Sequence, residues 1–228
     1  MTRSLERFKS LILDELLPEF CDDASRSYGR DGFNENSIQI SERDASDFLR
    51  AFDANLIVHH ERGLYGASRS QIWEQFFWEG LKSKTPRPVT LWIEPIITVA
   101  VLARLHFDFK WPKDLIGTQS KDWAFDAVAF LPGNNNEHIA CEVKKTVSEL
   151  DRMIELMMKY AADTSIDPAT MTKTQRNAYN KVSGLKTRHA PIFWAVGPDM
   201  ASHVFRVSYE NGGVAFESAT PEVLHYSQ

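Results

Sequence analysis

Two short apolar segments separated by a run of turn residues constrain the fold of this chain more than any other feature. The first, residues 123–131, reads WAFDAVAFL, and the second, residues 138–145, reads HIACEVKK. Between them lies Pro132-Gly133-Asn134-Asn135-Asn136, a composition typical of tight turns. The sequence therefore predicts a β-hairpin.

Charged residues are expected on one face of this hairpin. Side chains alternate along a strand, so Glu142 and Lys144 point one way while Cys141 and Val143 point the other way. A strand that is apolar on both faces is usually buried, and unpaired charges there would cost several kcal/mol. That cost is removed if Asp126 and Glu142 bind a hard cation such as Mg²⁺.

The order of these residues resembles the signature of the PD-(D/E)xK nuclease superfamily. Asp126 is followed, after fifteen residues, by Glu142-Val143-Lys144. Phe125 stands where that signature has its proline. The resemblance implies that Asp126, Glu142 and the backbone carbonyl of Val143 bind Mg²⁺, for which Mn²⁺ can substitute. It also implies that Lys144 orients or activates the attacking water.

The predicted elements follow the order of that family's core, which is helix, strand, strand, strand, helix, strand. They are a helix at Pro95–Leu105, a strand at His106–Trp111, the hairpin, a helix at Val147–Ala162 and a strand at Pro191–Val196. We therefore expect an α/β fold with a restriction-endonuclease-like core from about residue 89 to 228. Its mixed central sheet would be flanked by helices and preceded by a mainly helical N-terminal part, residues 1–88.

The two ends of the chain have weaker signals. Apolar spacing predicts N-terminal helices at Leu5–Leu17, ended by Pro18, at Ser46–Val58 and at Ser68–Lys82. A terminal hairpin is expected from His203–Tyr209 and Val214–Glu217, joined by Asn211-Gly212-Gly213. No catalytic motif is visible in either region.

Glu94 has two interpretations. In the superfamily, an acid on the first core helix often helps to position a metal or its water, and Glu94 is the candidate, with Glu79 as a weaker substitute. Alternatively, Glu94 complements the positive N-terminal end of the helix that begins near Pro95, which is worth under about 1 kcal/mol. The sequence does not decide between them.

Net charge is −5, but the charges are unevenly distributed. Residues 14–61 hold twelve acids and four Lys or Arg, whereas residues 168–191 hold no acid. The basic residues of this second segment, which are candidates for nucleic-acid contacts, are Lys173, Arg176, Lys181, Lys186 and Arg188. A solvated basic helix without a partner is the alternative.

Gln175 and Tyr179 match the Gln-x-x-x-Tyr pattern of RecB-like members of the superfamily. The pattern begins 31 residues beyond Lys144, outside the helix that directly follows the main motif. Any amphipathic helix can place two such side chains on one face. We therefore interpret this match as coincidental.

Composition predicts a cytoplasmic protein without a membrane span. Two cysteines imply no disulfide framework, and the first twenty residues mix charges through the apolar positions. The longest apolar stretch, residues 89–105, is interrupted by Glu94 and Pro95.

Together these patterns predict an endonuclease that hydrolyses phosphodiester bonds with Mg²⁺. The resemblance implies DNA as the substrate, with RNA as the open alternative, and a homodimer would supply two active sites for cutting both strands. The alternative is a non-catalytic module that binds nucleic acid or protein on a nuclease-like fold.

Overall fold

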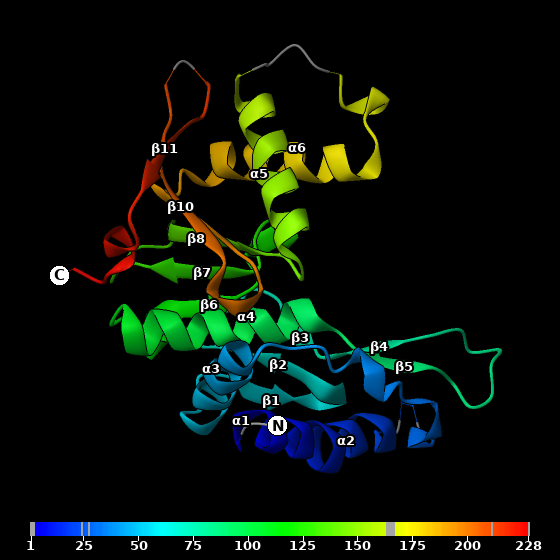
Figure 1. Ribbon diagram of the computed structural model, residues 1–228. Coiled ribbons are helices and arrows are strands. Elements are labelled where there is room, and N and C mark those ends of the chain that lie inside the picture. The colour runs from blue at the N-terminus through cyan, green and yellow to red at the C-terminus, as the bar shows by residue number, and fades with distance from the viewer. Residues whose placement is uncertain (1–2, 24, 27, 163–166, 211, 228) are drawn as a thin grey trace.

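A mixed sheet forms the centre of the protein. The computed structural model describes residues 3–23, 25–26, 28–162, 167–210 and 212–227 (Figure 1). The strands of the central sheet are β6 (Ile116–Thr118), β7 (Ala127–Phe130), β8 (Glu137–Val143), β9 (Ile192–Val196), β10 (Ser202–Ser208) and β11 (Ala215–Ala219). Their spatial order is β11-β10-β9-β8-β7-β6, with β8 and β9 parallel and the other neighbours antiparallel. The predicted α/β class with a mixed central sheet is confirmed.

Helices and shorter strands surround this sheet. The helices are α1 (Arg3–Ser10), α2 (Leu17–Asp22), α3 (Glu42–Asp53), α4 (Ile93–Ala103), α5 (Val147–Ala162) and α6 (Lys173–Arg188). The shorter strands are β1 (Val58–His60), β2 (Leu64–Gly66), β3 (Glu74–Gln75), β4 (Phe77–Glu79) and β5 (Val89–Leu91). Strands β1, β2 and β3 form one small sheet, and β4 pairs with β5 in a hairpin that projects from one end of the molecule (Figure 1).

The sheet has a different helical layer on each face. Helix α4 packs between the sheet and α3, while α5 and α6 lie on the opposite side (Figure 1). Residues 95–103 of α4 are all buried, which suits a helix covered on two sides. Cys141 and Val143 belong to the apolar core on the α4 side, whereas Ala140 belongs to the core under α5 and α6. The predicted alternation along β8 is confirmed.

Local sequence patterns predicted several helices and strands correctly. Helix α5 has the predicted bounds, and strand β9 begins one residue later than predicted. Strands β7 and β8 form the predicted hairpin, and β10 pairs with β11 as expected for the terminal hairpin. Asn211, in the predicted turn of that second hairpin, lies outside the described residues.

The strand predicted at His106–Trp111 is wrong. A π-helical segment, Arg104–Asp108, continues α4 there, and the strand that precedes the hairpin is β6. Arg104, the first residue of this continuation, reaches buried carboxylates of α3 and holds the helical segment in place. Trp111 donates its indole N–H to the carbonyl of Leu224 at 2.7 Å, which fixes the chain after the helix.

The helix predicted at Ser68–Lys82 is also wrong, because this segment contains β3 and β4. Phe77 is opposite Leu91 in the hairpin of β4 and β5. Phe76 and Phe77 are fully buried, whereas Trp78 is 61% exposed. Closely spaced aromatic residues also favour strands, and here the partner strand decides the conformation. The N-terminal part therefore contains strands as well as helices, and a boundary at residue 88 stays a prediction.

Two other N-terminal expectations need correction. Pro18 does not end the first helix: after the π-helical segment Leu11–Leu16, it occupies the first turn of α2, where a missing backbone N–H costs little. The helix predicted at Ser46–Val58 is α3, which begins at Glu42 because the Ser41 side chain caps it by accepting from the Asp44 N–H at 3.0 Å. It ends at Asp53, and Val58 begins β1.

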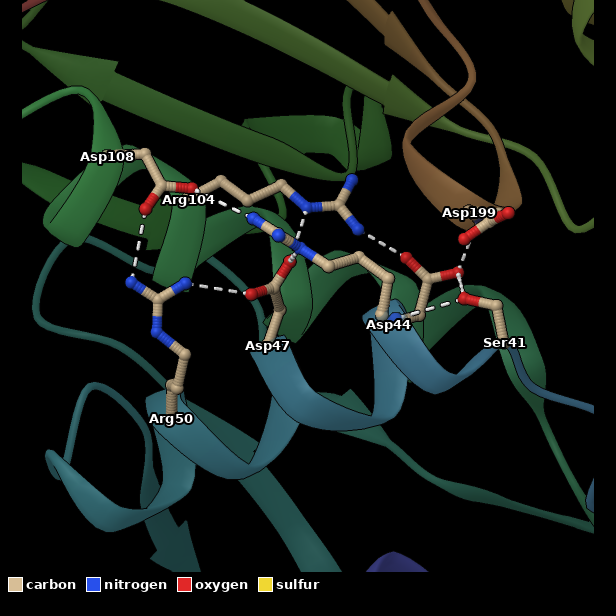
Figure 2. Close-up of polar contacts among 8 residues, drawn as sticks. Ser41, Asp44, Asp47, Arg50, Arg104, Asp108 and Asp199 are labelled. Atoms are coloured by element: carbon tan, nitrogen blue, oxygen red, sulfur yellow. Dashed lines mark hydrogen bonds and ion pairs between the residues drawn. The ribbon is translucent and has the colours of Figure 1, made fainter. Parts of the chain in front are cut away.

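A buried ion-pair network joins α3 to the end of α4 (Figure 2). The Arg104 guanidinium contacts Asp44, and its Nε lies 2.9 Å from Asp47 Oδ2. All three side chains are no more than 2% exposed. The Asp199 N–H donates to Asp44 Oδ2 at 2.7 Å, so the network also holds the loop after β9. It fixes the N-terminal helices against the layer that carries Glu94.

No helix in the described ranges is long and apolar enough to cross a membrane.

Candidate functional site

The register of β7 and β8 brings Asp126 and Glu142 face to face. Ala127 pairs with Cys141, so the residue before the first strand lies opposite the residue after Cys141. The Asp126 N–H donates to the Cys141 carbonyl at 2.9 Å, which continues the ladder by one step. Both carboxylates therefore lie on the side of the sheet that α5 and α6 cover.

Lys144 contacts two oxygens at the end of β8. Its ammonium lies 2.7 Å from Glu142 Oε1 and donates to the Val143 carbonyl oxygen, also at 2.7 Å. The backbone N–H of Lys144 donates to the Val196 carbonyl at 2.8 Å, so β9 holds this end of the strand. A single positive charge thus contacts both oxygens that the sequence assigned to a metal on this strand.

Asp126 presents one oxygen to the backbone and keeps one available. Its Oδ2 accepts from the Val143 N–H at 2.8 Å. Its Oδ1 makes no hydrogen bond or ion pair to any residue that the structure describes. The side chain is partly buried, so this oxygen is held near β8 with its acceptor sites unused.

Lys181 is a site residue whose role the sequence did not indicate. It was a candidate phosphate contact, yet its ammonium lies 2.6 Å from Glu142 Oε2 and donates to the Ala124 carbonyl at 2.8 Å. Glu142 is only 2% exposed, so its two oxygens are each paired with a lysine from a different element. Glu142 and Lys181 are 39 positions apart in the sequence, and no sequence pattern predicts their contact.

These contacts shift the pKa values of Asp126 and Glu142 in opposite directions. Burial and the neighbouring Glu142 carboxylate raise the pKa of Asp126 to about 6. Burial would also raise the pKa of Glu142, but Lys144 and Lys181 outweigh it and lower that pKa. Burial opposes the charge of Lys144, yet the nearby carboxylates, Glu142 above all, raise its pKa. At neutral pH Glu142 and Lys144 are therefore an ion pair.

An open cleft of about 970 Å³ leads to this cluster. Glu142 and Lys144 line it, and Glu94 reaches it from the first turn of α4. Asp126 is not among the lining residues and lies next to them under the strand end. The structure therefore brings Glu94 to the same cleft as Glu142, whereas Glu79 pairs with Arg87 at 2.6 Å and with Arg26 outside it.

Glu74 is an acid near this cluster that the sequence did not indicate. It lies on β3, is 4% exposed and accepts from Gln119 Nε2 at 2.8 Å. Burial, followed by the charges of Asp126 and Glu94, raises the pKa of Glu74 to about 8. The expected helix at Ser68–Lys82 concealed this position, because Glu74 reaches the cluster only when its segment is a strand.

The remaining basic residues of α6 have different surroundings. The Arg188 guanidinium contacts the Lys121 carbonyl, lies 3.7 Å from Asp122 and lines the cleft. Arg176 donates weakly to a carbonyl of the preceding loop, and like Lys173 and Lys186 it does not line the cleft. Arg152 of α5 lines it instead, although the sequence did not suggest this residue.

Gln175 and Tyr179 have structural partners. Gln175 and Thr172 form a reciprocal capping box at the start of α6. The Tyr179 ring packs edge-on against Tyr160, with centroids 6.1 Å apart. Neither side chain lines the cleft, in agreement with a coincidental match.

Within the described ranges, no three His, Cys, Asp or Glu side chains are arranged to hold a metal ion. No family model, curated protein or solved structure matches the chain. The functional argument therefore depends on the geometry of the cleft.

Proposed function

We propose that the protein is a Mg²⁺-dependent nuclease with a restriction-endonuclease-like core, which hydrolyses phosphodiester bonds in nucleic acid. The observation that carries the proposal is the position of the Lys144 ammonium, which lies 2.7 Å from both Glu142 Oε1 and the Val143 carbonyl oxygen. Two of the three predicted metal-binding groups therefore converge on one point, and that point already attracts a positive charge.

The donor set fits a hard divalent cation. Carboxylate and carbonyl oxygens are the protein ligands that Mg²⁺ prefers. Asp126 would contribute Oδ1, the oxygen that accepts from no described group. The raised pKa of Asp126 reflects burial and repulsion from Glu142, and a divalent cation between the two acids would relieve that repulsion. Bound there, Mg²⁺ would neutralise phosphate charge and lower the pKa of a water molecule.

The residues of the chain itself would have separate roles. Lys144 keeps its proton, because nearby carboxylates raise its pKa, so it orients a water and stabilises developing negative charge rather than accepting a proton. Lys181 restrains Glu142 through its contact at 2.6 Å. Glu94 lines the cleft from the N-terminal turn of α4, where it would position a second water molecule.

The order of elements supports the same proposal. Helix α4 is followed by β6, β7, β8, α5 and then β9, which is the helix-strand-strand-strand-helix-strand order of the superfamily core. DNA is proposed ahead of RNA on this resemblance. A homodimer stays part of the proposal, because one active site cuts one strand at a time.

A non-catalytic binding module is the second candidate, and one observation favours it. Both Glu142 oxygens are paired with ammonium groups, from Lys144 and Lys181, so the charge of this carboxylate is compensated without a metal. In such a module the charges would form a structural network and the cleft would hold nucleic acid without cutting it.

Cleavage of labelled DNA with and without Mg²⁺ separates the two candidates. The enzyme proposal predicts that Glu142→Ala reduces Mg²⁺-dependent cleavage by about 100-fold or more. Glu149→Ala is the matched control, because Glu149 lines the same cleft but, among the described residues, its side chain pairs only with Lys145, at 3.8 Å. Cleavage within about twofold of the unmodified protein is expected for this control.

Folding must be checked, because Glu142→Ala leaves two lysines without their carboxylate. Asp126→Asn is the second variant: it can still accept from the Val143 N–H and removes a charge that burial disfavours. We expect it to fold and to lose cleavage to the same degree. Unchanged cleavage in both variants would refute the assignment, and no cleavage by the unmodified protein with Mg²⁺ or Mn²⁺ would favour the binding module.

A further inference from the structure

An exposed tryptophan lies at the edge of the cleft. Trp123 is 60% exposed and lines the cleft together with Glu142 and Lys144. Its ring makes no aromatic contact or hydrogen bond with any part of the chain that the structure describes. Tryptophan is usually well buried, so an unused indole face beside a polar cleft needs an explanation.

The loop that carries Trp123 is held in place. The backbone of Ser120 donates to the Phe125 carbonyl at 2.8 Å, and the Phe125 N–H donates to Ser120 Oγ at 2.9 Å, which closes the loop at its base. Lys181 binds the Ala124 carbonyl from α6. The backbone is fixed from two sides, while the indole ring projects without an aromatic or hydrogen-bonding partner among the described residues.

The same loop has an unfavourable backbone conformation. Asp122 and Trp123 have φ angles of 60° and 57°, and a bulky residue with positive φ is uncommon. Such conformations persist where surrounding contacts impose them, and they concentrate at functional sites. Here the Arg188 guanidinium donates to the Lys121 carbonyl, directly before the two residues. The conformation directs a large aromatic side chain to the cleft instead of the core.

Other residues that line the cleft are polar or charged. Asn177 and Asn180 of α6 line it, and an amide side chain can both donate to and accept from the edge of a base. Arg152 of α5 and Arg188 of α6 line it as well and can contact phosphates. The volume lies near the upper end of the roughly 300–1,000 Å³ typical of ligand pockets, enough for a short segment of a strand.

We propose that Trp123 is a stacking platform for an unpaired base, so that the cleft takes single-stranded or locally unpaired nucleic acid. This inference rests on the proposed function, because it assumes that phosphates approach Glu142 and Lys144. In a duplex both faces of each base are already stacked, so a side chain at the edge of a cleft can stack only on a base outside the helix. Stacking on an aromatic ring tolerates any base, which suits a platform that provides no hydrogen bond.

Trp78 provides a matched control. It is 61% exposed, lies on β4 in the projecting hairpin, and packs edge-on against Trp92 with centroids 5.9 Å apart. It does not line the cleft. A general affinity of nucleic acid for exposed tryptophan would involve Trp78 and Trp123 equally, whereas a platform in the cleft requires Trp123.

Binding can be measured without catalysis, using the full chain in EDTA. The probes are a fluorescein-labelled 12-nucleotide single strand, as DNA and as RNA, and the DNA duplex of the same sequence, followed by anisotropy. We expect tighter binding of a single strand than of the duplex. Trp123→Ala should weaken single-strand binding about 5- to 150-fold, the equivalent of one stacked base. Trp123→Phe should retain most of the affinity, and Trp78→Ala should change it less than twofold.

Several results would overturn the inference: equal binding of strand and duplex, no effect of Trp123→Ala, equal effects of Trp123→Ala and Trp78→Ala, or no binding of any probe. Cleavage assays with Mg²⁺ then separate this inference from the proposed function. Trp123-dependent binding without cleavage sustains the platform and refutes the nuclease. Duplex cleavage that does not depend on Trp123 refutes the platform and sustains the nuclease.

Discussion

The ammonium of Lys181 lies 2.6 Å from Oε2 of Glu142, and this ion pair joins α6 to the end of β8. Glu142 is almost completely buried, so removing one of its two partners leaves a poorly compensated charge. The pair therefore links the stability of the fold to the proposed chemistry of the cleft.

Lys181→Met should destabilise the protein by about 1.5–3 kcal/mol, the usual value of a hydrogen bond to a charged group. It should also raise the pKa of Glu142, because Lys181 is one of the two charges that lower it. The pH at which cleavage begins would then increase. Urea denaturation and a pH–rate profile measure the two effects. Lys173→Met, at an exposed position on the same helix, is the control that should change neither.

Arg104→Leu should be far more damaging than the loss of an exposed ion pair. It leaves Asp44 and Asp47, both fully buried, without their main counter-ion (Figure 2), and breaking a buried pair costs about 3–5 kcal/mol. Arg7→Ala breaks the exposed pair with Asp53 and should cost under about 1 kcal/mol. Equal denaturation midpoints for the two variants would mean that the buried network contributes no more than the exposed pair.

The same network predicts how stability depends on acid. Burial would raise the pKa of Asp47, but hydrogen bonds from Arg104 and Arg50 outweigh it and lower that pKa. The stabilisation is therefore complete above the unfolded-state pKa, near 4, and is lost as the pH falls through the lower folded-state value. Thermal unfolding between pH 2 and 6 measures it, and Arg104→Leu should show a smaller loss over that range than the unmodified protein.

The raised pKa of Glu74 predicts that stability decreases as the pH rises, the opposite of the effect of Asp47. Its pKa is raised to about 8, first by burial, so the folded protein holds a proton that the unfolded chain releases near pH 4.5. Stability should therefore fall as the pH rises from about 5 to 8. Glu74→Gln keeps an acceptor for Gln119 and should flatten this decline, with a gain on the order of 1–3 kcal/mol at pH 9. If the stability of Glu74→Gln depended on pH in the same way as that of the unmodified protein, this would contradict the raised pKa of the buried Glu74.

The position of Arg152 in the cleft predicts how nucleic-acid binding depends on salt. It lines the cleft but lies outside the basic segment that the sequence emphasised. Arg152→Ala should reduce the slope of log K against log salt concentration by about 0.7 for a single strand, the value for one phosphate contact. Arg206→Ala removes the same charge from an exposed position on β10 and should leave the slope unchanged. Equal slopes for both variants would place the phosphates elsewhere.

The sequence predicted the parts of the fold that local patterns determine. The hairpin of β7 and β8 follows from two apolar runs and a turn, and α5 follows from its apolar spacing. Strand periodicity also placed Glu142 and Lys144 on one face, where the structure has them in contact. These relationships depend on residues close in sequence, and for that reason they could be derived without coordinates.

Contacts between distant segments could not be derived in the same way. Strands β3, β4 and β5 have only two or three residues each, too few for a periodic pattern, so their pairing decides their conformation. Glu74 joined the acidic cluster only through that pairing. The contact between Lys181 and Glu142 depends on how α6 lies across the sheet, and the distribution of charge along the chain does not determine this.

Anomalous diffraction from crystals soaked in Mn²⁺ tests the central claim most directly. The account predicts one strong peak between Asp126 and Glu142, about 2.0–2.6 Å from a carboxylate oxygen of each and from the Val143 carbonyl, with the Lys144 ammonium displaced from its present contacts. A structure without a peak at this place, in which Lys144 and Lys181 still pair with Glu142 at saturating Mn²⁺, would contradict it.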